Sequence, residues 1–177
     1  MRVIAGELGG RRLATPRGAA TRPTSERVRE ALFSMLGAID GLRVLDLFAG
    51  SGALGIEALS RGAARATFVE RAPGALAALR ANVAALDLGE RCEIRTSDAL
   101  AALRSSGQYD LVFIDPPYAD AAELAGALSR GLPAVLAAGA RVVSESDRRE
   151  PLALELPLVR ERRYGDTMIR IHETSEP

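Results

Sequence analysis

The chain has 177 residues, of which 47% are hydrophobic and 26% charged, and its formal net charge is zero. This length and composition fit one globular domain with at most a small appendage, and the zero net charge excludes a uniformly basic nucleic-acid binder. No apolar run reaches the about 18 residues of a membrane span, and the start turns polar too soon for a signal peptide. The lone cysteine, Cys92, excludes an internal disulfide, so we expect a cytoplasmic protein. We also expect a monomer.

Positive charge is concentrated at the N-terminus. Residues 1–30 contain seven Arg and three Glu, a balance of +4, whereas residues 31–177 contain sixteen Arg and twenty acidic residues, a balance of −4. All 23 basic residues are arginine, which excludes any mechanism that needs lysine, such as Schiff-base chemistry.

The first residues predict a β-hairpin, because strand-like residues 2–5 and 11–14 flank a turn at Gly9 and Gly10. An arm rich in proline, glycine and threonine follows at residues 16–24.

A helix is predicted next, with Thr24 as its N-cap, because apolar residues recur at helical spacing from Val28 to Leu36. We assign residues 1–38 to an N-terminal extension and residues 39–177 to the main domain.

The main domain alternates between strand-like and helix-like segments. Strands are predicted at 43–48, 66–70, 92–96, 109–114 and 140–145, and helices at 53–62, 73–87, 98–104 and 120–130. This alternation predicts an α/β, Rossmann-like fold with a mostly parallel sheet and helices on both faces. Two last strand-like segments, 156–163 and 168–172, predict an antiparallel hairpin at one edge of what becomes a seven-stranded sheet.

The first predicted strand runs into a glycine-rich loop, and residues 50–55 have the spacing G-x-G-x-x-G. Glycines at this spacing let the backbone approach a ligand, and the N-terminus of the following helix attracts negative charge. An NAD-type pyrophosphate would use both features, and so would the carboxylate of S-adenosylmethionine.

Acidic residues at three strand ends distinguish these two cofactors. Asp46, near the end of the first strand, suits the ammonium group of S-adenosylmethionine and would repel a pyrophosphate. Glu70 ends the second strand and suits ribose hydroxyls, and Asp98 follows the third and suits an adenine amino group. We therefore expect S-adenosylmethionine, bound by Asp46, Phe48, Gly50, Gly52, Glu70, Asp98 and Ala99.

The fourth predicted strand ends in Asp115, Pro116, Pro117 and Tyr118. Two consecutive prolines fix φ twice, so the backbone leaves the strand along one path. The Asp115 carboxylate and the Pro116 carbonyl can both accept hydrogen bonds from one NH2 group and so aim its nitrogen lone pair, while Tyr118 can stack on a base. These four residues predict methyl transfer to an exocyclic amino nitrogen, with guanine N2, adenine N6 and cytosine N4 all open as acceptors.

Further motifs narrow the acceptor. The chain resembles, over nearly its whole length, the bacterial 16S ribosomal RNA guanine-N2 methyltransferase family. The resemblance rests on the glycine loop, the D-P-P-Y corner, Arg22-Pro23-Thr24 and Tyr164-Gly165-Asp166-Thr167. The resemblance implies S-adenosylmethionine as donor, a guanine of 16S ribosomal RNA as acceptor, an assembling 30S particle as partner, and no metal. Methyltransferases of protein glutamine resemble it less, because they typically carry Asn where this chain has Asp115, and a non-catalytic nucleotide-binding module would have no use for the corner.

The N-terminal extension is then the expected RNA-binding part, because arginine can contact phosphates and stack on bases. The arginines expected to do so are Arg11, Arg12, Arg17, Arg22, Arg27 and Arg29. Neither Cys92 nor the single histidine, His172, is expected to be catalytic, since both lie in strand-like segments with apolar neighbours.

Overall fold

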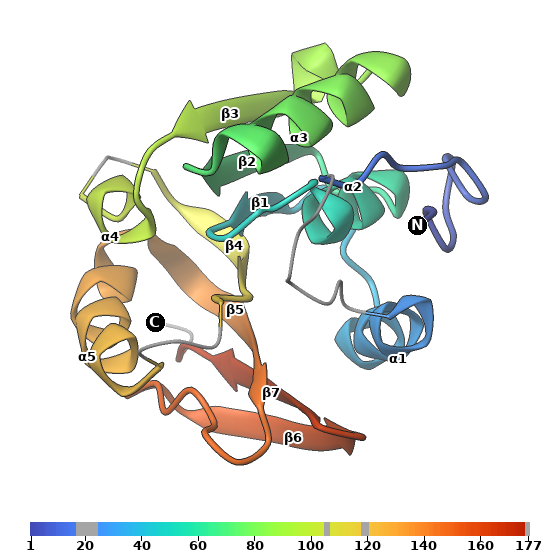
Figure 1. Ribbon diagram of the computed structural model, residues 1–177. Coiled ribbons are helices and arrows are strands. Elements are labelled where there is room, and N and C mark those ends of the chain that lie inside the picture. The colour runs from blue at the N-terminus through green and yellow to red at the C-terminus, as the bar shows by residue number, and fades with distance from the viewer. Residues whose placement is uncertain (17–24, 105–106, 118–120, 176–177) are drawn as a thin grey trace.

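The structure is a computed structural model that describes residues 1–16, 25–104, 107–117 and 121–175. Among these residues seven strands form one sheet, in the order β3-β2-β1-β4-β5-β7-β6 (Figure 1). The strands are β1 Arg43–Asp46, β2 Arg65–Glu70, β3 Cys92–Thr96, β4 Tyr109–Ile114, β5 Leu136–Asp147, β6 Leu158–Tyr164 and β7 Thr167–Glu173. The helices are α1 Glu26–Leu36, α2 Ala53–Ser60, α3 Pro73–Ala85, α4 Ala99–Ala102 and α5 Ala121–Gly131, with 3-10 turns η1 Gly89–Arg91 and η2 Leu132–Ala134. The predicted α/β fold, with its parallel strands and antiparallel C-terminal pair, is confirmed.

The strand order reverses direction beside β1. This strand pairs in parallel with β2 on one side and with β4 on the other, so the chain crosses the sheet between β3 and β4. In open parallel sheets, ligands bind beyond the carboxyl ends of the strands at such a reversal. The fold therefore directs a binding site to the loops that follow β1 and β4.

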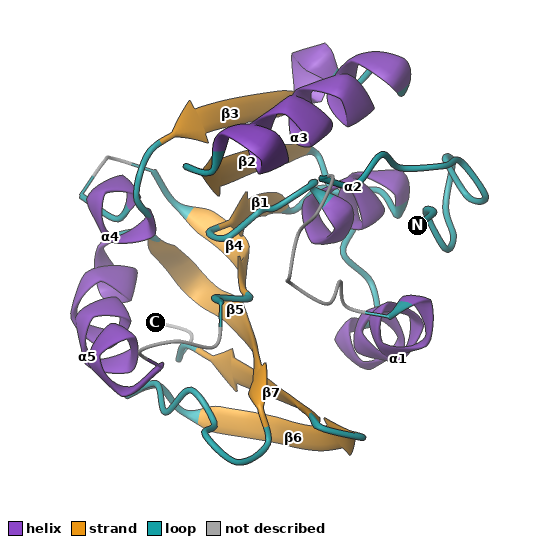
Figure 2. Cartoon of the chain, viewed as in Figure 1, coloured by secondary structure: helices purple, strands orange, loops and turns teal. Residues whose placement is uncertain are grey.

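Helices cover both faces of the sheet (Figure 2). On one face α1, α2 and α3 bury a cluster that includes Leu32, Ile56 and Leu79. On the other face α4 and α5 bury a second cluster that includes Ala102 and Leu128. The N-terminal extension contributes to the first cluster as well, since Val3 and Leu13 are 1% and 5% exposed.

The predicted N-terminal hairpin has the expected turn and direction but only one antiparallel bridge, Arg2 to Arg12, among the described residues. The backbone leaves this ladder after Val3 because the next two amides bond elsewhere. Ile4 and Ala5 donate to the Glu57 carboxylate of α2 over 2.7 and 3.1 Å. Docking onto α2 has replaced cross-strand pairing.

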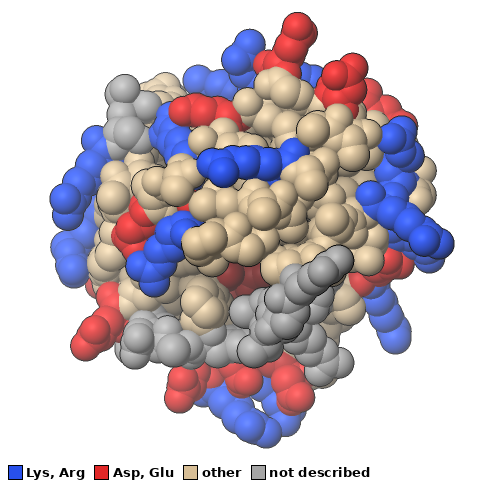
Figure 3. Space-filling view, turned by 45° about the horizontal axis from the view of Figure 1, so that its top comes forward, with Lys and Arg blue, Asp and Glu red and all other residues tan. Residues whose placement is uncertain are grey.

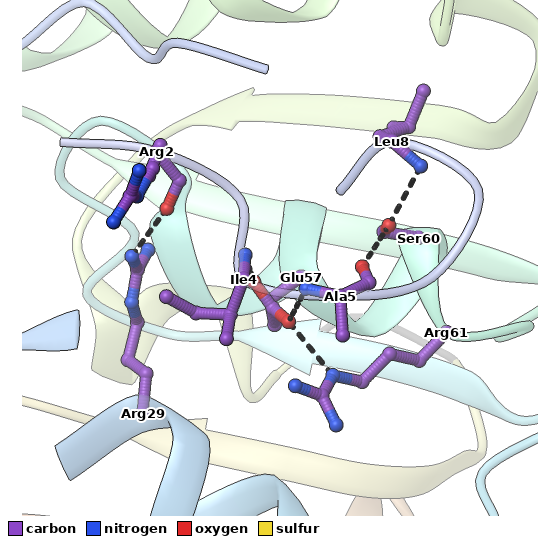
Figure 4. A network of polar contacts seen from close by, with 8 residues as sticks. All are labelled: Arg2, Ile4, Ala5, Leu8, Arg29, Glu57, Ser60 and Arg61. Atoms are coloured by element: carbon purple, nitrogen blue, oxygen red, sulfur yellow. Dashed lines mark hydrogen bonds and ion pairs between the residues drawn. The ribbon is translucent and has the colours of Figure 1, made fainter. Parts of the chain in front are cut away.

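Figure 4 shows the polar contacts that hold this segment. Glu57 is fully buried and also accepts a hydrogen bond from Nε of Arg61 over 2.7 Å. Arg29 of α1 donates to the Arg2 carbonyl, and the Ser60 hydroxyl donates to the Ala5 carbonyl. One buried carboxylate thus holds the N-terminal segment, which also bonds to α1.

Helix α1 begins one residue later than predicted. Its N-cap is Ser25, whose hydroxyl accepts from the Val28 amide over 3.2 Å, so the prediction of Thr24 is wrong; Thr24 itself lies outside the described residues. Gly37 ends the helix with φ 66°, in the left-handed region that suits glycine.

Several other bounds differ from the predicted ones. Strand β1 ends at Asp46, and the predicted helix 98–104 spans only Ala99–Ala102. Strand β5 is longer than predicted at both ends. Leu136 at its start pairs with Tyr109 of β4, and Ser146 and Asp147 at its end pair with β7.

Strand β6 forms one edge of the sheet. Leu158 and Val159 are 49% and 55% exposed there, and the arginines that follow, Arg160, Arg162 and Arg163, are exposed too. Within the described part of the chain, no helix has the length and apolar character that crossing a membrane requires.

Gly6 and Gly10 provide a matched test of the docking of the N-terminal segment. Both have φ near +82° (83° and 82°), but a Cβ on Gly6 would lie 1.8 Å from the Ser60 carbonyl oxygen, whereas a Cβ on Gly10 would meet no atom of the described residues within 4 Å. We expect Gly10→Ala to lose about 1–2 kcal/mol of unfolding free energy through left-handed strain, and Gly6→Ala to lose clearly more. Urea unfolding and hydrogen exchange at the Ile4 amide measure both effects. Equal losses would mean that the close contact with Ser60 is unimportant.

Candidate active site

The glycine loop lies directly after β1 and is held from the next strand. The Gly50 amide donates to Oε2 of Glu70, at the end of β2, over 2.8 Å. Gly52 is the N-cap of α2 with φ 86° and supplies no side-chain hydrogen bond to the helix. The first-turn amides of α2 are therefore not capped by that residue, which leaves this helix end suited to a carboxylate.

The three glycines of the loop serve different purposes. A Cβ on Gly52 would lie 2.5 Å from Cδ1 of Leu79, and one on Gly55 would lie 2.3 Å from Cε1 of Phe68. These two glycines allow α2 to approach the sheet and α3 closely. A Cβ on Gly50 would meet no described residue within 4 Å, so on that side the backbone at Gly50 borders space where a ligand can approach.

Asp46 lies beneath the loop, 1% exposed, and its Oδ2 accepts from the Gly55 amide over 3.1 Å. Burial raises the pKa of this carboxyl group to about 7, although the hydrogen bond from Gly55 acts in the opposite direction. Asp46 therefore holds the loop from below, and its predicted contact with a cofactor ammonium stays a prediction.

Glu70 accepts hydrogen bonds from three backbone amides. Its Oε2 bonds to Gly50, and its Oε1 bonds to Arg71 and Ala72 over 2.7 and 2.8 Å. The side chain is only partly buried, and a carboxylate has about four acceptor positions. Capacity for one further donor remains, as the predicted ribose contact requires.

The other predicted cofactor residues surround the same edge of the sheet. Asp98 is the N-cap of α4, accepting from Leu100 over 2.9 Å, and forms an exposed ion pair with Arg71 at 3.2 Å. Ala99 is 5% exposed, and Phe48 is half-buried against the second hydrophobic cluster.

The Asp-Pro-Pro corner follows β4 and lies beside the glycine loop. Phe113 is in register with Asp46, and its carbonyl accepts from the Leu47 amide over 3.0 Å, so the chain after β4 runs next to the chain after β1. Asp115 is half-buried at this point. Tyr118 lies outside the described residues.

A cleft of about 210 Å³ opens beside this corner. Its walls come from the corner and from the end of β5 with the turn that follows. The lining residues are Pro116, Pro117, Ser146, Asp147, Arg149, Glu150 and Leu152. We refer to it as the Ser146 cleft.

Asn82 of α3 is a residue that the sequence analysis missed. It is 3% exposed, and its amide group donates to the Ser51 carbonyl in the glycine loop and to the Ala14 carbonyl over 2.9 and 3.0 Å, while accepting from the Ala14 amide. One signal was available, because Asn82 is a polar residue on the apolar stripe of its helix. Asn82 joins the N-terminal extension to the glycine loop.

Cys92 and His172, which were not expected to be catalytic, have no activated side chain. Burial raises the pKa of the Cys92 thiol to about 11, which disfavours the reactive thiolate. His172 is 2% exposed, burial lowers its pKa, and its Nδ1 lies 3.0 Å from the Leu156 carbonyl oxygen. In the described residues, no group of three or more His, Cys, Asp or Glu side chains is arranged to hold a metal ion.

The predicted RNA-contacting arginines divide into three groups. Arg11, Arg12 and Arg27 are exposed. Arg17 and Arg22 lie outside the described residues. The prediction for Arg29 is wrong, because its side chain is 0% exposed and faces Glu57 and the Arg2 carbonyl instead of solvent.

Comparison with known proteins agrees with this geometry. A family model described as conserved hypothetical protein 95 matches residues 1–173. The Bacillus subtilis protein YlbH, named as a candidate rRNA methyltransferase, is 37% identical over 98% of both chains. Ribosomal RNA small subunit methyltransferase D of Escherichia coli is 43% identical over 67% of this chain and 60% of its own length.

Solved structures give the same picture. The Escherichia coli protein yhhF, named as a candidate methyltransferase, has a TM-score of 0.84 at 35% identity and covers 100% of this chain and 99% of its own. A 16S rRNA N2 methyltransferase of T. thermophilus, RsmC, solved with AdoMet and guanosine, has a TM-score of 0.71 at 25% identity over 89% of this chain and 44% of its own.

Asp46 makes the stability of the protein depend on pH. Because its pKa rises from 3.8 to about 7 on folding, the folded protein keeps a proton that the unfolded chain loses in this interval. Its contribution to stability is present in full below 3.8 and falls as pH rises toward 7, by up to about 1.4 kcal/mol per pH unit. Asp46→Asn, which keeps a neutral acceptor for Gly55, should remove this slope. Urea unfolding of both proteins across the interval measures the difference, and parallel curves would contradict the prediction.

Proposed function

Because the chain belongs to the family described as conserved hypothetical protein 95, we propose that it transfers a methyl group from S-adenosylmethionine to the N2 amino group of a guanine in small-subunit ribosomal RNA. The rRNA methyltransferase names of the relatives that match this chain support the substrate class. The assembling 30S particle is the proposed context of the reaction.

One observation carries the proposal. The predicted cofactor residues lie at or just after the carboxyl ends of β1, β2 and β3, whereas Asp115 follows β4, and β1 pairs directly with β4. The glycine loop and the Asp-Pro-Pro corner therefore meet where the strand order reverses. This is the place where an open parallel sheet binds a ligand, and here it would hold the donor on one side and the acceptor on the other.

The residues present fit the donor. Gly50 borders open space among the described residues. The N-terminus of α2, where Asp46 already accepts from the Gly55 amide, would also attract the carboxylate of the cofactor. Glu70 keeps acceptor capacity for ribose hydroxyls, and Asp98 with Ala99 would lie at the adenine end. When bound, S-adenosylmethionine supplies an electrophilic methyl group. Asp46 and Phe48 complete the set, Asp46 by holding the loop beneath the ligand.

The protein's own contribution to the chemistry is to position the amine. Asp115 and the Pro116 carbonyl would accept both hydrogens of the NH2 group and direct its lone pair, while Tyr118 would stack on the base. The two prolines fix the path of the backbone, so this geometry needs little rearrangement at the moment of reaction. A strong general base is not needed, because the amine attacks while it is neutral and becomes acidic only as it is alkylated.

RNA would be held by exposed arginines. Arginine and acidic side chains are interspersed on the face seen in Figure 3, so the surface there is not uniformly basic. Arg12 and Arg27 are exposed and have no ion-pair partner among the described residues, whereas Arg11 donates to the Ala85 carbonyl over 3.1 Å. We expect Arg12 and Arg27 to be the most available for phosphates.

Asp115 tests the proposed reaction. Asp115→Ala should abolish methyl transfer to 16S rRNA while leaving affinity for S-adenosylmethionine within a few fold, because the carboxylate serves the amine. Tritium transfer to 30S particles that lack the modification, digestion to nucleosides, and calorimetric titration of the cofactor measure both. Asp110→Ala is the matched control, since Asp110 is the second residue of the same strand and pairs with Arg43 at 3.1 Å; it should retain transfer. Turnover by Asp115→Ala, or a product other than N2-methylguanosine, would contradict the proposal.

Arg12 and Arg27 test the proposed RNA contact. Replacing both with Gln should weaken RNA binding and reduce the slope of log affinity against log salt by about 0.7–0.9 for each lost phosphate contact. Arg65→Gln is the control, because Arg65 is exposed at the start of β2, at the edge of the sheet opposite the site. Filter binding over a salt series gives the slopes. Parallel slopes for the double variant and the wild type would show that these arginines do not contact phosphates.

A further inference from the structure

Asn82 connects two parts of the molecule that the proposed function uses for different ligands. On one side it bonds to Ala14 in the N-terminal extension, two residues after the exposed Arg12, and on the other to Ser51 in the glycine loop. These partners lie 68 and 31 residues away along the chain. The extension is the part expected to hold RNA, and the loop is the part expected to hold S-adenosylmethionine, so one side chain contacts both.

The amide group of Asn82 uses both of its donor hydrogens. Its Oδ1 accepts from the Ala14 amide over 2.7 Å, and its Nδ2 donates to the Ala14 and Ser51 carbonyls over 3.0 and 2.9 Å. The side chain is only 3% exposed, so water cannot readily replace a lost partner. If Ala14 moves away, buried polar atoms of Asn82 lose their partners, and if Asn82 follows Ala14, the Ser51 carbonyl loses its own. The positions of Ala14 and Ser51 are therefore energetically linked.

The bond to Ser51 helps to fix the conformation of the glycine loop. The Gly52 amide, in the same peptide group as the Ser51 carbonyl, donates to the Ala49 carbonyl over 2.7 Å, so both polar atoms of this peptide are paired. The Ser51 amide itself makes no hydrogen bond with any described residue. It lies next to Gly50, where the backbone borders space that a ligand can enter. Asn82 thus helps to orient a loop amide that can donate to the carboxylate of the cofactor.

The bond to Ala14 reaches a well-anchored segment of the extension. Leu13, the preceding residue, is 5% exposed in the first hydrophobic cluster, and its amide donates to the Met1 carbonyl over 2.9 Å. Arg12 comes just before it, forms the bridge to Arg2 and is exposed. A phosphate held at Arg12 would therefore restrain the same short segment that bonds to Asn82.

We propose that Asn82 couples the two sites, so that RNA on the extension and S-adenosylmethionine in the glycine loop each raise the affinity of the protein for the other. A ligand that restrains either partner of Asn82 reduces the conformational freedom that the second ligand must still remove, which gives positive cooperativity without a large change of shape. This inference rests on the proposed function and deepens it. Asn82 becomes a positioning residue through which the target RNA promotes binding of the methyl donor.

Binding measured without turnover tests the coupling. S-adenosylhomocysteine, radiolabelled, takes the place of the methyl donor, and its Kd is measured by equilibrium dialysis with and without saturating 30S particles that lack the modification. We expect the wild type to bind it roughly 5–10-fold more tightly in the presence of the particle, within the usual range for coupled sites. The particle should bind more tightly by the same factor when S-adenosylhomocysteine is present, because linkage is reciprocal. Asn82→Ala should remove both effects.

Arg91→Gln is the matched control. Arg91 also ties the extension to the main domain, but its bonds go to Glu7 and to the carbonyls of Leu59 and Ala63, all outside the glycine loop. Both variants should lose some stability to urea, whereas only Asn82→Ala should lose the coupling. Coupling that survives in Asn82→Ala, or that is lost equally in Arg91→Gln, would overturn the proposal.

Hydrogen exchange in the wild type provides a second measurement that needs no variant. S-adenosylhomocysteine should slow exchange of the Ala14 amide, which donates to Asn82, more than exchange of the Gly10 amide, which donates to Val3 within the extension. Equal slowing of the two amides would be general stabilisation by a ligand and would contradict the coupling. If the wild type binds both ligands independently, the coupling alone is wrong; if it binds neither, or transfers no methyl group to 16S rRNA, the proposed function fails.

Discussion

Two carboxyl groups that accept hydrogen bonds from the glycine loop fix the geometry on which the rest of the structure depends. Glu70 bonds to Gly50, and Asp46 bonds to Gly55. Both come from the carboxyl ends of neighbouring strands, so the sheet itself determines where the loop lies. A loop held only by its own backbone would adopt many conformations, because each glycine adds conformational freedom. Here the glycines let the loop approach its neighbours closely, and hydrogen bonds to the Asp46 and Glu70 side chains then restrict its conformation.

The position of α2 follows from this loop, and the position of the N-terminal extension follows from α2. The helix carries Glu57 into the interior, where it accepts from two amides of the extension and from Arg61. A buried carboxylate without such donors would be strongly destabilising. The extension therefore completes the main domain, and apolar residues of the two share one hydrophobic cluster. The charges in this part of the interior are structural, and Arg29 belongs with them.

The sequence was sufficient for most of the fold and for the two central motifs because their signals are local. Apolar periodicity located the main-domain strands and helices within a few residues, and the glycine loop and the Asp-Pro-Pro corner are each continuous in the chain. Asn82 and the buried state of Arg29 were missed because their partners lie 31 and 27 residues away. The sequence predicted more cross-strand pairing in the N-terminal hairpin than the structure has, because strand propensity does not reveal a competing hydrogen-bond acceptor such as Glu57.

The exposed strand β6 has a consequence for how the molecule behaves at high concentration. An edge strand with accessible apolar residues, here Leu158 and Val159, is a template on which the strand of another molecule can pair and begin an aggregate. Arg160, Arg162 and Arg163 follow at once along the same strand and are exposed. Bringing two such edges together would place these cations opposite one another. Their repulsion would disfavour edge-to-edge pairing and so keep the protein in solution. A role of that kind accounts for positive charge at this edge without any RNA.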